Sequence, residues 1–206
     1  MAEIRFESTH EIIGYWEAAK TDVYAPVRSD IRPDGLAKLL PRVFIVGEEK
    51  LKWIFRLAGT ELYGVYGAEL TGRPLSYMWG GENVRVTASL RRAGGISRPL
   101  LVHSMSSGAE GEVFTETVML PMRSSRDFAD VDRFLGLQSF SRPKPWWLGN
   151  MPVTGARIVA MDVVQDLETA GAAEKRGRET PVISLSGVVK PRLRVIEGGR
   201  LDQPAG

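Results

Sequence analysis

The chain opens with apolar residues at helical spacing. Ile12, Trp16 and Ala19 recur every three to four positions, and Ser8 followed by Glu11 has the form of a capping box. These features predict an N-terminal helix over residues 7–20. Its apolar stripe is narrow and aromatic, so it has to pack either on its own domain or on the same helix of a second copy.

Two prolines predict an extended connector after this helix. Pro26 and Pro33 stand within eight residues of each other, and the residue before a proline avoids helical geometry. Pro33 suits the first turn of a short helix that carries Leu36 and Leu39, and we expect Pro41 to end that helix.

Alternating apolar and polar residues then predict a first hairpin. Residues 43–46 and 51–58 have the pattern of strands joined by a polar turn. Trp53 and Phe55 face one side of the second strand, while its charged residues face the other.

A second hairpin and a last strand follow further along the chain. Residues 99–106 and 112–122 flank a loop rich in glycine and serine, and residues 133–140 have the pattern of a final strand. Hairpin connections imply that these strands are antiparallel.

The segment between the two hairpins has a helical pattern. Thr60 can cap a short helix that Gly67 ends, Gly72 lies in a turn, and residues 82–92 form a longer helix. The order is therefore one helix, two strands, several short helices and three strands. This order predicts an α+β fold with a five-stranded antiparallel sheet and short helices on one face.

Beyond residue 141 the pattern weakens. Pro143 interrupts regular structure, and residues 157–164 are apolar enough to form a strand or to lie along the sheet. The last part is rich in Gly, Ala, Glu and Arg and poor in aromatic residues, which is typical of a flexible tail. We divide the chain into an N-terminal flanking helix (1–25), a central domain (26–141), a C-terminal extension packed on that domain (142–167) and a mostly flexible basic tail (168–206).

Composition narrows the class of function. The chain has no cysteine, which excludes disulfides, thiolate nucleophiles and cysteine-ligated metals. No apolar run approaches the roughly 20 residues that cross a bilayer, and the N-terminus lacks a signal-peptide pattern. We expect a cytoplasmic protein with no membrane contact. The formal charge is only +2. Much of the excess of basic residues lies in the last segment, where it is too widely spaced to favour nucleic-acid binding.

Four strings resemble one family. They are PVRSDIRP (26–33), LLPRVF (39–44), FRLAGTEL (55–62) and GAELTGR (67–73), and the stretch 55–73 is the most specific. The chain from Tyr15 to Phe140 resembles the PAS-like domains found in proteobacteria, often as short stand-alone proteins of unassigned function. The resemblance implies a bacterial signal-transduction domain that binds a small ligand or cofactor between sheet and helices, or mediates dimerisation and partner docking. Nothing in this sequence resembles an attached kinase, cyclase or DNA-binding domain, so we expect a signalling partner to carry the output.

The same resemblance directs attention to the space between sheet and helices. Side chains from the second strand, the short helices and the third predicted strand can surround a small apolar pocket, or can fill it completely as core residues. The expected lining residues are Phe55, Leu57, Leu62, Val65, Leu75, Met78, Leu101 and Met105.

Catalytic and cofactor chemistry finds little support. His10 and His103 are the only histidines, and neither has a hydrolase motif around it. His103 could ligate haem, but the resemblance places such a histidine on the helical side, so we expect a plain strand residue and no metal site. A covalent flavin adduct needs a cysteine. We therefore predict no catalytic residue and no enzymatic activity, and the identity of any cofactor stays open.

Surface apolar residues suggest where a partner could dock. Ile12 and Trp16 on the first helix could join two copies, and Trp146 and Trp147 lie in a proline-rich stretch where one can pack and one protrude. We predict a sensory or regulatory domain that works through ligand binding, dimerisation or partner docking. The alternative is a pure protein-interaction adaptor with a filled core and no ligand.

Overall fold

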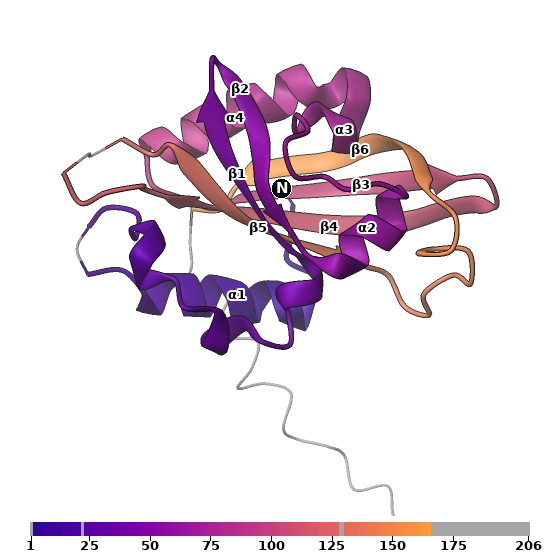
Figure 1. Ribbon diagram of the computed structural model, residues 1–206, viewed down its shortest axis with the longest axis horizontal. Helices are drawn as coiled ribbons and strands as arrows, with labels where there is room; N and C mark the ends of the chain where they lie inside the picture. The colour runs from indigo at the N-terminus through magenta and orange to yellow at the C-terminus, as the bar shows by residue number, and fades with distance from the viewer. Residues whose placement is uncertain (1, 22, 128–129, 166–206) are drawn as a thin grey trace, which may run out of the picture.

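The computed structural model describes residues 2–21, 23–127 and 130–165. The predicted tail over residues 168–206 lies outside the described residues. Figure 1 shows a sheet between two layers, with α1 on one side and α3 and α4 on the other. We call the face under α2, α3 and α4 the inner face, and the face under α1 the outer face.

The described residues form one six-stranded antiparallel sheet. Its spatial order is β2-β1-β5-β4-β3-β6. The strands are β1 (Val43–Glu49), β2 (Lys52–Ala58), β3 (Leu100–Gly108), β4 (Gly111–Met122), β5 (Arg133–Phe140) and β6 (Val153–Val163). The predicted fold class is confirmed, and the prediction for residues 133–140 matches β5. A sixth strand joins the five expected ones, because the segment left open at 157–164 pairs with β3 and starts four residues earlier.

Three helices lie over the inner face, and short 3-10 turns connect elements of the chain. The helices are α2 (Thr60–Tyr66), α3 (Ser76–Trp79) and α4 (Asn83–Gly95), with 3-10 turns at Arg28–Asp30, Pro33–Leu36, Leu40–Arg42 and Gly80–Glu82. Gly67 ends α2 with a φ of 63°, a left-handed conformation that glycine adopts without strain. Two details of the sequence prediction are wrong. Gly59 rather than Thr60 caps α2, and Pro41 lies inside a 3-10 turn instead of ending a helix.

On the outer face, α1 (Glu7–Ala18) packs its apolar stripe on the sheet. Ile12, Ile13 and Trp16 are buried among strand residues of the same chain. The predicted capping box does not form. Phe6 occupies the N-cap position, and the Ser8 hydroxyl lies 2.9 Å from Ser139 Oγ on β5. The stripe that predicted the helix therefore serves this domain's own core.

A close approach on the inner face requires one particular glycine. A Cβ atom added at Gly136 on β5 would lie 2.1 Å from the Phe44 ring of β1. Phe44 in turn meets Phe55 edge to face, with ring centroids 5.4 Å apart. These contacts hold the Phe44 and Phe55 rings together in the inner core.

Candidate functional site

Most of the expected pocket residues lie together on the inner face. Phe55, Leu62, Val65, Leu75 and Met78 are all buried in one apolar cluster with residues of β1, α4 and β5. The sequence therefore predicted which side chains from β2, α2 and α3 meet. They contact one another closely, as core residues do.

Three expected lining residues lie elsewhere. Leu57 is 42% exposed because the β1–β2 pairing shifts register between Ile45 and Val46, and Arg56 becomes an extra residue. Leu101 belongs to the outer cluster. Met105 is half-buried and lies on the same face of β3 as Leu101, because alternate side chains on a strand point to the same side. The prediction was wrong for Leu101 and Met105 because alternation alone does not determine which face of a strand packs under the helices.

Polar side chains interrupt the inner apolar cluster on β3 and β4. Thr115 Oγ1 lies 2.7 Å from Ser104 Oγ and 3.2 Å from Ser106 Oγ. Thr117 continues this row on β4, and Gln138 is its pairing partner on β5. All five are buried. We call them the polar floor: Ser104, Ser106, Thr115, Thr117 and Gln138.

One hydroxyl of the polar floor is unsatisfied. Tyr66 from α2 donates a 3.0 Å hydrogen bond to Gln138 Oε1, and burial raises the pKa of the Tyr66 phenol. The Thr117 hydroxyl, by contrast, has no hydrogen-bond partner among the described residues. A buried hydroxyl without a partner costs free energy, so this atom is the exception in an otherwise satisfied row.

The loop between β5 and β6 covers one end of the inner face. Trp147 and Leu148 are buried in the inner cluster, and the Trp147 ring lies against Gly108 at the end of β3. On the other side, a Cβ added at Gly64 of α2 would lie 3.1 Å from the carbonyl oxygen of Gly149. Figure 1 shows this loop beside α2 at the hairpin end of β3 and β4. Trp147 is therefore the packed member of the tryptophan pair and does not project to a partner, so its inclusion among the docking residues was wrong.

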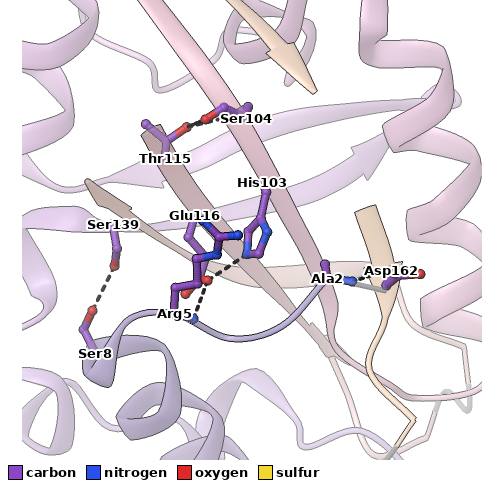
Figure 2. A network of polar contacts seen from close by, with 9 residues as sticks. All are labelled: Ala2, Arg5, Ser8, His103, Ser104, Thr115, Glu116, Ser139 and Asp162. Carbon is purple, nitrogen blue, oxygen red and sulfur yellow. Dashed lines mark hydrogen bonds and ion pairs between the residues drawn. The ribbon is translucent and has the colours of Figure 1, made fainter. Parts of the chain in front are cut away.

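A second polar network lies on the outer face. His103 Nε2 on β3 and Glu116 Oε2 on β4 are 2.8 Å apart and both residues are buried (Figure 2). The same carboxylate oxygen accepts a 2.8 Å hydrogen bond from the Arg5 backbone N–H, and the Arg5 guanidinium lies 4.8 Å from the centre of the Phe114 ring. The pair thus holds the N-terminal segment on the sheet.

Sequence reasoning considered His103 and missed Glu116. The available signal was a glutamate two residues before Val118, on the side of the strand that Val118 and Leu120 make apolar, and paired with His103. In the part of the chain that the structure describes, no cluster of three or more His, Asp or Glu side chains is placed to hold a metal ion. No helix in this part is long and apolar enough to cross a membrane.

The expected docking residues divide into buried and exposed ones. Ile12 and Trp16 are fully buried, and the Trp16 indole N–H donates a 2.7 Å hydrogen bond to the carbonyl oxygen of Pro121. Their apolar surface is therefore not available to a second copy. Trp146 is 66% exposed, so its side chain stays accessible to a docking partner.

Comparison with known families decides the assignment. A family model described as a PAS domain matches residues 4–139. The chain belongs to the PAS domain family. PAS domains are generally sensory or regulatory rather than catalytic. No match is found among curated proteins.

Several solved structures are similar to this PAS domain. A light-oxygen-voltage (LOV) domain studied with a flavin analogue has 14% identity and a TM-score of 0.43, over 53% of this chain and 84% of that one. The dark structure of the blue-light photoreceptor Aureochrome1 LOV has 16% identity and a TM-score of 0.41, over 52% and 80%. A Rhodobacter sphaeroides LOV protein has 17% identity and a TM-score of 0.41, over 57% and 73%.

Proposed function

We propose that this PAS domain is a sensor that binds a small ligand with hydrogen-bonding groups on the inner face and passes the signal to a partner protein, without catalysis of its own. The observation that carries the proposal is the unpartnered Thr117 hydroxyl in the polar floor. Small-molecule sites are mostly apolar, with a few placed polar groups that orient the ligand. The polar floor within the inner cluster has this composition.

The energetics favour an occupant at Thr117. Leaving a hydroxyl buried without a hydrogen bond costs about 1–3 kcal/mol relative to a satisfied one. A ligand atom within hydrogen-bond distance would recover this free energy, and Gln138 on the neighbouring strand would add a second polar contact. Binding would then exploit a group that the free domain leaves unsatisfied.

Room for the ligand has to come from side chains that now cover the floor. Trp147 and Leu148 are buried in the inner cluster but come from a loop rather than a helix, so we expect them to move without unfolding α2 or the sheet. Displacement of this loop would also move the exposed Trp146. This gives a physical route from the inner face to a surface that a partner can contact.

Native mass spectrometry of the chain purified from cells tests the proposal. We expect a retained small molecule in the wild type and its loss in Thr117→Val, which keeps the shape and removes the hydroxyl. Thr154→Val on β6 is the matched control, since that hydroxyl is exposed and contacts only the Ser107 carbonyl among the described residues. A bare monomer in every sample would remove ligand sensing and self-association, and leave docking to another protein.

The second candidate is a pure adaptor with a filled core. The close packing of Phe55, Leu62 and Val65 with their neighbours favours it, together with the exposed Trp146 beside the buried Trp147. The test is to measure how much of a co-purifying partner is recovered with the wild type and with Trp146→Ala, which should recover less. Tyr77→Ala, another exposed aromatic on the same domain, is the control. Equal recovery by both variants would contradict docking at Trp146.

A further inference from the structure

A cavity lies apart from the polar floor, between the β1–β2 hairpin, residues 74–76 and α4. Its volume is about 410 Å³, within the range of small-molecule sites. Trp53 of β2 and Asn83 of α4 are among its lining residues, and none of the polar-floor residues lines it. We call it the β2–α4 groove.

Two buried polar atoms of the groove residues are unsatisfied. Trp53 is only 4% exposed, yet its indole N–H has no acceptor among the described residues. Asn83 Oδ1 is also buried and lacks a donor in the same part of the chain. Trp16, a buried indole on the other face, shows the usual arrangement, because it donates to a backbone carbonyl. Two residues that line the groove thus carry one unpaired donor and one unpaired acceptor, and both atoms are buried among the described residues.

The charge of the groove selects for an anion. Lys52 and Arg91 are among its lining residues, whereas no acidic side chain is, as far as the described residues show. Arg91 has a weak partner, Glu48, at 3.5 Å, and both side chains are substantially exposed. Asn83 is also the first residue of α4, where backbone N–H groups add partial positive charge.

Apolar surface completes the groove. Leu51 and Val84 line it with exposures of 75% and 77%. Leu51 is held there by a hairpin turn in which Lys50 and Leu51 have φ values of 48° and 65°. Residues other than glycine adopt this left-handed conformation only at a cost in free energy. The turn thus keeps a large apolar side chain at the mouth of the groove.

We propose that the β2–α4 groove binds a small amphipathic organic anion. Its anionic group would lie by Lys52 and Arg91 and accept a hydrogen bond from the Trp53 indole. A donor group on the ligand would reach Asn83 Oδ1, and its aromatic or aliphatic body would cover Leu51 and Val84. This site is additional to the ligand site proposed on the inner face, because the two are built from different residues.

Anilinonaphthalene sulfonate (ANS) is a suitable probe, since it carries a sulfonate, an N–H donor and an aromatic body. The chain has five tryptophans, so the indole region of a nitrogen–proton correlation spectrum reports each one. The Trp53 signal is identified by its contact with the Phe134 ring, whose centroid lies 5.1 Å away. We expect the Trp53 indole to shift in a saturable manner and the Trp16 indole to stay in place.

Neighbouring arginines supply a matched pair of variants. Arg91→Ala should weaken ANS binding about tenfold, whereas Arg92→Ala, also exposed on α4 but outside the groove, should leave it unchanged. Glu48→Gln frees Arg91 and should maintain or tighten binding. Thr117→Val should bind ANS like the wild type, which separates this site from the polar floor.

Two results would overturn the proposal. One is the absence of ANS binding to the folded wild type up to millimolar concentration. The other is binding that leaves the Trp53 indole unshifted or that falls equally in Arg91→Ala and Arg92→Ala. Thermal unfolding of each variant, monitored by circular dichroism, establishes that the compared proteins are folded.

Discussion

Thr117 is the residue on which the proposed ligand site depends. Its hydroxyl is buried and finds no partner in the described part of the chain, so the free domain gains nothing from it. Thr117→Val should therefore raise the free energy of unfolding by about 1 kcal/mol. Urea denaturation of the ligand-free protein measures this change.

Thr154→Val provides the reference for the same chemical change at an exposed site, where we expect a shift within about 0.5 kcal/mol. A Thr117→Val variant that is less stable than the wild type would mean that the hydroxyl is satisfied in the free protein. The polar floor would then be ordinary core structure.

Tyr66 gives the molecule a pH dependence of known sign. Burial raises the pKa of its phenol above the value of about 10 that holds in the unfolded chain. The folded state therefore keeps a proton that the unfolded state loses, so the Tyr66 contribution is complete below about pH 10 and declines as pH rises beyond it. In Tyr66→Phe this decline should be absent.

The measurement is urea unfolding of both proteins from about pH 8 to about pH 11. The stability of the wild type relative to Tyr66→Phe should fall by up to roughly 1.4 kcal/mol per pH unit above pH 10. A difference between the two proteins that does not change with pH would show that Tyr66 is exposed to solvent.

At the scale of elements, α1 is part of the core. Trp16 and Ile12 lie fully buried between the helix and the sheet. Trp16→Ala should lower the free energy of unfolding by about 3–5 kcal/mol, whereas Trp146→Ala should change it by less than about 0.5 kcal/mol. Guanidinium denaturation distinguishes these outcomes. Nearly equal free energies of unfolding for the two variants would contradict a core role for α1 and favour a docking role.

The strands show what the pattern of apolar and polar residues can and cannot predict. Short apolar or alternating runs bounded by turn residues predicted five strands. The pattern could not place Leu101 on the correct face, since both faces of β3 are buried and both parities are apolar. Leu57 was misplaced by a register shift that depends on the pairing with β1, which is a long-range contact.

The segments outside the main pattern were the hardest to predict. β6 starts at Val153, inside a stretch with few strand signals, and it forms because β3 offers an open edge for pairing. The capping box at Ser8 failed for a related reason. Ser139 on β5 engages that hydroxyl, and only the tertiary structure brings the two together.

For the whole molecule, the order of elements was sufficient to predict the α+β class and the antiparallel sheet. The two-sided covering of the sheet was not, because the stripe on α1 fits a second copy as well as its own domain. The candidate sites could not be predicted from the sequence either. Thr117 and Asn83 have ordinary sequence contexts, and only the burial of their polar atoms without a partner among the described residues distinguishes them.

The central claim is that the inner face takes a small ligand through the polar floor. Thermal unfolding of the wild type and Thr117→Val against one library of polar metabolites tests it most directly. We predict that at least one compound raises the Tm of the wild type by several degrees and raises that of Thr117→Val much less. A library in which no compound raises the wild-type Tm, or in which every effective compound stabilises both proteins equally, would contradict the claim.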